Sequence, residues 1–172
     1  GCKESDAAVA EFIRLQRTIA KIQLRTPPNP RYAGHGPKTL IDAQKASLKF
    51  DDSMWLGFEG VDIEAELDLG ANAALRKITV SCLEDMNSWI FFPTAVEFFT
   101  SQDGVDYQSA GSVTYGIPRR NTEAAMRFFS APLANVMTRY VKVRVKNVGV
   151  CPEWHKGAGG KAWVFADEII VE

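Results

Sequence analysis

The chain has 172 residues, 46% of them hydrophobic, with 20 basic and 21 acidic side chains and a formal net charge of −1 at pH 7. This length is typical of one domain with its own core, and the balanced charge excludes the broad positive surface that a nucleic-acid partner requires. No run reaches the roughly 18 apolar residues of a membrane span, so we expect no transmembrane segment.

The first segment is expected to be helical. Ser5 and Asp6 are suitable N-cap residues, and apolar residues then recur at helical spacing, which predicts a short helix over residues 6–17. We interpret residues 1–17 as a linker and residues 18–172 as the domain. Cys2 at the extreme N-terminus is what a mature bacterial lipoprotein would carry, and an arbitrary boundary explains it equally well. The expected location is periplasmic, on the cell surface or secreted.

Period-two alternation begins at residue 18 and predicts a strand that ends at the prolines of residues 27–30. A long loop with turn chemistry follows over residues 32–37, and His35 between two glycines reads as an exposed turn residue. The next strand, over residues 61–70, has apolar residues on one face and four acids on the other. This alternation favours a solvated sheet face over a metal cluster.

Further strands are predicted over residues 75–83, 95–101 and 107–115, with Asp103-Gly104 as a hairpin turn. The pattern continues with strands over residues 126–130 and 140–146. The basic row on the second of these, Lys142, Arg144 and Lys146, is expected to be solvated or paired with the acidic strand. About eight strands and one weak helix indicate an all-β antiparallel sandwich, with function in the loops at its ends.

Two loops combine aromatic with polar residues. Residues 151–163 hold half of the tryptophans, Trp154 and Trp163, together with His155, Lys161 and several glycines, and residues 84–93 hold Trp89. Indole rings beside hydrogen-bonding groups suit a sugar, because the ring stacks on the C–H face of a pyranose while donors reach its hydroxyls. The alternative is that Trp154 and Trp163 only close one end of the core.

The sequence contains no recognisable catalytic constellation. It has two histidines, and neither accompanies a nucleophile in a recognisable elbow. The glycines of residues 157–160 do not form a phosphate-binding loop, because His155 and Ala162 occupy the positions that need Gly and Ser or Thr. Three cysteines give no zinc spacing. A disulfide between Cys82 and Cys151 is compatible with an oxidising compartment, and the sequence does not decide it.

Several segments, in order, resemble the discoidin domain, the coagulation factor V/VIII type C module. They are Leu40-Ile41-Asp42 followed by Trp55, Glu66 to Gly70, Pro93 with Val96 to Phe98, Ser101 to Tyr107, Ala134 to Val143, and Asp167 to Ile169. The resemblance covers about residues 38–172. It implies a jelly roll of the galactose-binding-like fold. The loop from Pro152 to Trp163 is similar to C-terminal modules of bacterial exo-acting glycosidases, especially family-20 β-hexosaminidases of gut Bacteroidetes.

The resemblance also implies site residues. The sugar-binding branch, the family-32 carbohydrate-binding modules, stacks its ligand on an aromatic residue at the position of Trp163. The family often carries a structural Ca²⁺, and the matching side chains are Asp42, Ser47 and Glu168. Backbone carbonyls would have to complete the six to eight oxygens that calcium takes. The glycine usual after Asp42 is Ala43 here, which departs from the family pattern.

These observations give a first hypothesis and two rivals. The first is a noncatalytic carbohydrate-binding module of an exo-glycosidase that binds galactose or an N-acetylhexosamine, with Trp163 as platform and Trp154, His155, Lys161 and Trp89 around it. The second is a structural domain that packs on a catalytic domain or another protein and binds no sugar. The third, an independent hydrolase, has the least support in the sequence.

Overall fold

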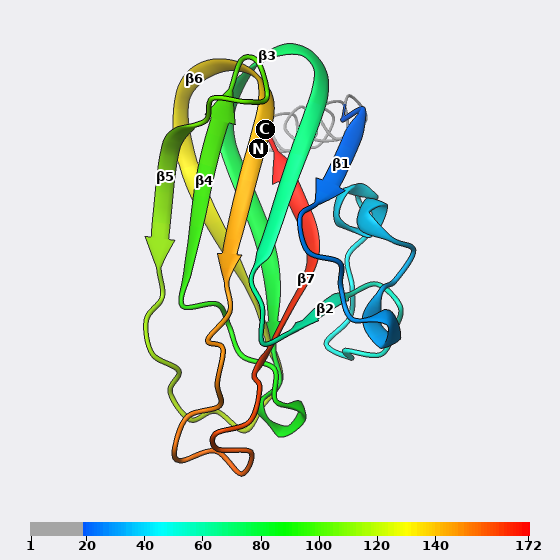
Figure 1. Ribbon diagram of the computed structural model, residues 1–172, viewed down its shortest axis with the longest axis vertical. Coiled ribbons are helices and arrows are strands. Elements are labelled where there is room, and N and C mark those ends of the chain that lie inside the picture. Colours follow the sequence, from blue (N-terminus) through cyan, green and yellow to red (C-terminus); the bar gives the residue numbers. More distant parts are fainter. Residues whose placement is uncertain (1–18) are drawn as a thin grey trace, which may run out of the picture.

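The computed structural model describes residues 19–172, and the helix predicted over residues 6–17 lies outside them. The described residues form seven strands and three short 3-10 helices (Figure 1). The strands are β1 (Lys21–Leu24), β2 (Leu56–Glu59), β3 (Ile63–Glu84), β4 (Ala95–Ser101), β5 (Gln108–Thr114), β6 (Ala125–Lys146) and β7 (Trp163–Val171). The 3-10 helices are η1 (Pro30–Tyr32), η2 (Pro37–Ile41) and η3 (Met86–Ser88).

All strand pairs are antiparallel, and the hydrogen-bonded order is β2-β7-β3-β6-β4-β5, with β1 also paired to β3. The two long strands β3 and β6 pair with each other along most of their length and arch over together at one end of the molecule (Figure 1). The arch coincides with register shifts in their pairing after Asp68 and after Leu75. One hydrogen-bonded sheet is thereby folded into two layers.

The first layer contains β1, residues 63–69 of β3, residues 138–146 of β6, β4 and β5. The second contains β2, β7, residues 77–84 of β3 and residues 125–132 of β6. The predicted all-β antiparallel sandwich is therefore confirmed. Seven strands replace the expected eight or so, because two pairs of predicted strands are each one continuous bent strand and because β2 was not predicted. We refer to the arch with the β4–β5 turn as the bend end, and to the opposite end as the loop end.

The core lies between the layers and consists of the inward residues of alternating strands. Ile63, Ala65, Leu67 and Leu69 of β3 are all at most 4% exposed, as the alternation predicts. Full burial of one such side chain contributes about 1.5–3 kcal/mol. Val61, predicted to share this face, precedes the strand and is 42% exposed.

The excursion between β1 and β2 covers the outer face of the second layer. A second apolar cluster forms there, in which Trp55 is 1% exposed and packs with Leu83 and Phe165. This cover explains why residues 78–84 of β3 are buried on both faces. One of the four tryptophans is therefore a core residue, and the other three are half-buried.

The acidic face of β3 meets the basic face of β6, which is the pairing alternative expected from the sequence. Arg144 donates to Glu64 at 2.7 Å, Arg25 donates to the same carboxylate at 3.2 Å, and Arg139 donates to Asp68 at 3.0 Å. Glu64 is only 8% exposed, so it is not the solvated acid that the sequence predicted. Burial opposes its charge, but the hydrogen bonds from Arg144 and Arg25 hold its pKa below the usual value.

The helices of the described part are short. None of them is long and apolar enough to cross a membrane.

Candidate functional site

Three connections meet at the loop end: residues 85–94 between β3 and β4, residues 115–124 between β5 and β6, and residues 147–162 between β6 and β7 (Figure 1). The first contains η3, which ends at Trp89 in the left-handed conformation, with φ of 62°. The backbones of Asp85 and Ile90 exchange two hydrogen bonds of 3.0 Å and close this loop. Trp89 is thus presented at the tip of a tight connection.

The glycine-rich connection is built around the Trp89 indole. A Cβ atom at Gly157 would lie 1.7 Å from Nε1 of Trp89, so only glycine lets the indole pack on this backbone. Several backbone bonds close the loop on itself, including Cys151 N–H to the Gly160 carbonyl at 2.8 Å. Gly157, one of the glycines of this loop, therefore has a packing reason.

His155 holds two of these loops together. It is 8% exposed, its Nδ1 accepts the Gly157 N–H at 2.9 Å, and its Nε2 contacts the carbonyl oxygen of Met86 in η3 at 2.5 Å. The first bond makes Nδ1 an acceptor, so Nε2 carries the proton and donates it to Met86. Both ring nitrogens are engaged, and the imidazole acts here as a positioning group for the loops.

Trp89, Trp154 and His155 come together as the sequence predicted. The His155 ring meets Trp89 edge-on at 5.3 Å between centroids and Trp154 at 6.2 Å. Each indole also lies beside a cation: the Lys156 ammonium is 4.8 Å from the centre of Trp89, and the Arg120 guanidinium is 5.4 Å from that of Trp154. The result is a wall of two half-buried indoles and one buried imidazole, with a cationic side chain beside each indole.

A hollow of about 220 Å³ opens beside this wall. Polar residues also line it: Asn87 from the connection after β3, and Asn121 and Thr122 from the connection after β5. Arg120 contributes as well, and its guanidinium donates to the Trp154 carbonyl at 3.1 Å. Sites for drug-sized ligands measure roughly 300–1,000 Å³, so this hollow suits a single sugar ring.

The sequence interpretation missed Arg120, Asn87, Asn121 and Thr122. The only signal was a polar run of residues 119–122 after Pro118, which read as an ordinary loop. Asn121 also gives the buried Glu84 carboxyl a hydrogen-bond partner, because its side-chain amide donates to Glu84 at 3.1 Å. Burial raises the pKa of Glu84, and the bond from Asn121 offsets part of that shift.

Trp163 belongs to a different cluster. Its backbone N–H donates to the Trp89 carbonyl at 2.9 Å, but its indole packs edge-on against Tyr32 at 5.3 Å and tilted against Phe165 at 5.8 Å. A separate hollow of about 190 Å³ adjoins this cluster and is lined partly by Tyr32, Arg31 and Phe50. The structure thus divides the predicted sugar site between two neighbouring aromatic clusters.

Lys161 is exposed and lies two residues before β7. Its aliphatic stem lies against Gly60, where an added Cβ would be 3.2 Å from the lysine side chain. It does not line either aromatic hollow. Its role in sugar binding stays a prediction.

The residues expected to hold calcium converge in part. Glu168 is 3% exposed and hydrogen-bonds to Asp42, while the neighbouring Asp167 accepts from the Ala46 N–H at 3.0 Å and from the Ser81 hydroxyl. Burial is the largest cause that raises the pKa of Glu168 to about 10, and the neighbouring Asp42 carboxyl contributes to this rise. A cation between Asp42 and Glu168 would relieve this penalty.

Ser47, the third predicted ligand, is turned elsewhere. Its N–H and hydroxyl both donate to Asp52, at 2.8 and 2.7 Å, and its carbonyl accepts from the Trp55 indole at 2.9 Å. Among residues 19–172, no three His, Cys, Asp or Glu side chains form a metal-binding group. Asp42 and Glu168 therefore lie together as the calcium prediction requires, whereas the Ser47 hydroxyl is bonded to Asp52 instead.

Cys82 and Cys151 are both free and buried. Cys82 belongs to the core between the layers, and Cys151 packs with Met86 and Phe91 under the loop end. The disulfide that the sequence left open is not formed. Burial raises the pKa of both thiols.

No protein-family model and no curated protein matches this sequence. Solved structures do match its fold, which is that of discoidin-like, family-32 carbohydrate-binding modules. The module CpGH89CBM32-5 of Clostridium perfringens, solved with GalNAc-β-1,3-galactose, superposes with a TM-score of 0.54 and 17% identity, covering 91% of this chain and 96% of that one.

Two further matches have the same level of similarity. The C-terminal domain of a chitobiase from Bacteroides fragilis matches with a TM-score of 0.51 and 16% identity, over 90% of this chain and 95% of that one. A fucolectin from Morone saxatilis serum matches with 0.56 and 16%, over 91% of this chain and 47% of that one. The fold suggested by the sequence resemblance is therefore confirmed.

Proposed function

We propose that this chain is a noncatalytic carbohydrate-binding module that binds the terminal sugar of a glycan at the loop end. The observation that carries the proposal is the hollow lined by half-buried Trp154 and by the polar side chains of Arg120, Asn121 and Asn87. Indole faces attract the C–H face of a pyranose, and the polar groups can bond its hydroxyls. A fold shared with carbohydrate-binding modules supports the same function.

The proposed ligand is a terminal galactose or N-acetylhexosamine. One solved structure with this fold contains GalNAc-β-1,3-galactose, and another is a domain of a chitobiase. The Arg120 guanidinium and the Asn121 amide are suitable donors for an N-acetyl carbonyl. A single ring offers few contacts, and its hydroxyls exchange water for protein at little net gain, so we expect Kd values of ~mM to tens of μM.

We further propose that the module is an accessory domain of a bacterial exo-glycosidase of the β-hexosaminidase type, located in the periplasm, on the cell surface or outside the cell. In that setting it would hold a catalytic domain near the glycan ends on which that domain acts. The similarity to a chitobiase C-terminal domain supports this assignment. Zymography of the natural full-length protein on aryl N-acetylhexosaminides, with and without residues 19–172, would test it.

Titration of the protein with galactose, N-acetylgalactosamine and N-acetylglucosamine tests the sugar site. We expect Trp154→Ala to weaken binding by at least about tenfold, as loss of a buried aromatic anchor does. Trp163→Ala is the informative second variant, because Trp163 was the platform expected from the sequence and lies in the other cluster. Unchanged binding in Trp163→Ala places the ligand beside Trp154, whereas loss in Trp163→Ala alone transfers the site to the hollow beside Tyr32.

A structural domain without sugar binding remains the rival function. It is favoured by Ile117 and Val150, which are 84% and 55% exposed in the loop-end connections and would suit a protein interface. If none of the three sugars binds, and Ile117→Glu disrupts association with the catalytic domain of the natural protein, the docking function replaces the sugar site. Retained association in that variant excludes docking through this residue.

We also propose that Asp42 and Glu168 hold a structural Ca²⁺, with backbone carbonyls around Leu40 and Lys45 completing the oxygen shell. The bound ion would neutralise the two acids and fix the connection after η2. Calcium should then raise the Tm of the wild type, and chelator should lower it. Glu168→Gln should abolish this response, while Glu84→Gln, a change at another buried glutamate, should keep it. A Tm that changes neither with calcium nor with chelator would refute the site.

A further inference from the structure

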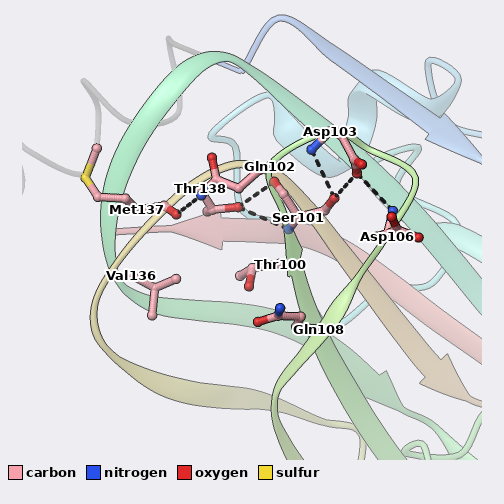
Figure 2. A pocket seen from close by; sticks show the side chains of 9 residues that line it. All are labelled: Thr100, Ser101, Gln102, Asp103, Asp106, Gln108, Val136, Met137 and Thr138. Atoms are coloured by element: carbon pink, nitrogen blue, oxygen red, sulfur yellow. Dashed lines mark hydrogen bonds between the residues drawn. The ribbon is translucent and has the colours of Figure 1, made fainter.

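A second hollow, of about 260 Å³, lies at the bend end (Figure 2), which is opposite the loop end (Figure 1). Its walls are the end of β4, the β4–β5 turn, the start of β5 and residues 136–138 of β6. The described side chains that line it include hydroxyls, amides, two carboxylates and two apolar residues, with no aromatic ring and no basic group among them. Nothing in the proposed loop-end site uses these residues.

Hydrogen bonds fix the distance between the two walls. The Thr138 hydroxyl accepts from the Ser101 N–H at 3.1 Å and donates to the Ser101 carbonyl at 2.8 Å. Across the rim, the Gln102 amide donates to the Met137 carbonyl at 2.5 Å (Figure 2). Thr138 and Ser101 are 1% and 5% exposed. The hollow is therefore rigid before any ligand arrives.

The turn at the rim is fixed in the same way. The Asp103 carboxylate accepts the N–H groups of Val105 and Asp106, both at 2.9 Å, and the Ser101 hydroxyl at 3.0 Å. These bonds hold the pKa of Asp103 below its usual value. Asp103 is thus an ionised turn residue whose Oδ1 atom already accepts three hydrogen bonds.

Two polar side chains of the lining take no part in the hydrogen bonds that fix the walls and the turn. Thr100 is 9% exposed, and the exposed Gln108 is its register partner on β5; the side chain of neither makes a hydrogen bond to another residue of the lining (Figure 2). Both groups point into the hollow, where one offers a hydroxyl and the other an amide that can donate and accept.

The lining selects the chemical class of ligand. Asp103 and Asp106 repel anions, so phosphate and carboxylate ligands are unsuitable. A divalent cation would need more free oxygens than these provide, since Asp103 is committed to the turn. The remaining class is a neutral molecule with several hydroxyls, whose C–H groups would lie against Val136 and the half-exposed Met137.

We propose that this hollow is a second saccharide-binding site, in which Thr100 and Gln108 bond neighbouring hydroxyls of a neutral sugar and Val136 and Met137 contact its apolar edge. The site does not depend on the loop-end proposal, because it shares no residue with it. Two sites at opposite ends would let one module engage two glycan ends at once, which strengthens attachment to surfaces that carry many of them.

The test is a titration of the full chain, followed by amide NMR, with galactose, N-acetylgalactosamine and glucose as separate probes. We expect saturable shifts at residues 100–108 and 136–138 with at least one sugar. The double variant Thr100→Val with Gln108→Ala should weaken this binding about tenfold, since it removes two hydrogen bonds. It should leave the shifts at residues 120–122 and 154–156 unchanged.

Two controls keep the outcome interpretable. Thr114→Val removes an exposed hydroxyl at the other end of β5 and should change neither binding curve. Trp154→Ala should abolish only the loop-end curve. Shifts confined to the loop end, shifts at the bend end that survive the double variant, or shifts there caused by Ca²⁺ and by no sugar would each overturn the proposal. Sugar binding at the bend end alone would support it and refute the loop-end site.

Discussion

The loop end and the bend end both enclose a hollow, but they are built in different ways. At the loop end, irregular connections are held by side chains, chiefly the His155 ring and the Trp89 indole on Gly157. At the bend end, the walls are strand ends joined by hydrogen bonds between Thr138 and Ser101. We infer that the shape of the loop end depends on a few large contacts, whereas the bend end shares its rigidity with the sheet.

Gly157→Ala should have the largest effect. The new methyl group would occupy the place of the Trp89 indole, 1.7 Å from its Nε1, so the ring must leave the loop. We expect a loss of about 3 kcal/mol in the free energy of unfolding, at the upper end of overpacking effects, and a red shift of the tryptophan fluorescence. Urea unfolding followed by fluorescence measures both.

Gly159→Ala is the matched control in the same loop. Gly159 has φ of 81° and no atom near its missing Cβ, so this variant adds backbone strain without a collision. We expect a cost of about 1 kcal/mol with unchanged fluorescence. Equal effects of the two variants would show that the indole does not depend on Gly157.

His155→Phe should be the second-largest change. The ring keeps its bulk, but the Gly157 N–H and the Met86 carbonyl lose their partner, which should cost about 2–3 kcal/mol. The other histidine, His35, is exposed, and His35→Phe should stay within about 0.5 kcal/mol. Thermal unfolding of the two variants side by side decides whether the imidazole ties the loops together. If both histidine variants unfold like the wild type, His155 does not tie the loops.

Thr138→Val and Thr100→Val contrast the two hydroxyls of the bend end. The first removes the link between the walls and leaves the Ser101 N–H unpaired, so we expect a loss of about 2 kcal/mol. The second removes a hydroxyl that supports no other residue of the lining, and stability should change by less than about 0.5 kcal/mol. Chemical denaturation measures both. A destabilising Thr100→Val would mean that this hydroxyl belongs to the framework.

The smallest effect is a difference in titration between two acids. Burial raises the pKa of Glu84 under the loop end, whereas backbone N–H groups lower that of Asp103 at the bend end. On acidification Glu84 should therefore take up its proton well before Asp103. Carboxyl-carbon NMR measures the order directly, and a reversed order would contradict the two environments described here.

The sign of each effect on stability follows from these shifts. The contribution of Glu84 is present below its unfolded pKa and is lost as pH rises through the folded value, so Glu84→Gln should be tolerated at neutral pH. The contribution of Asp103 is present at neutral pH and is lost as pH falls through its folded value. Acid should loosen the β4–β5 turn before the loop end.

The sequence predicted the fold well where the physical pattern was simple. Alternation located β1, β4 and the first half of β3, and Asp103-Gly104 marked the turn between β4 and β5. It missed that β3 and β6 are continuous, because a bent strand interrupts the alternation just as a loop does. It also misplaced Glu64, since burial on the outer face depends on Arg25 and Arg144, which lie far away in the chain.

The candidate sites were predicted less completely. Tryptophans in a glycine-rich loop identified the loop end, but single residues carried no sign of which way they point, so Trp163 and Trp154 were placed together. Arg120 and Asn121 looked like ordinary loop residues until the chain brought them to Trp154. The bend-end hollow left no trace in the sequence, because its residues come from β4, β5 and β6 and are common on any strand.

The doubled-over β3–β6 ribbon has a consequence for how the protein acquires its structure. Each layer takes half of the same two strands, so neither layer can be completed while the other is absent. The pairing also joins residues 55 to 82 positions apart along most of its ladder, from Pro132 opposite Lys77 to Val145 opposite Ile63. Long closures of this kind slow the search for the native topology. We expect a single cooperative unfolding transition and slow refolding. The amides of both layers should lose their protection from hydrogen exchange together.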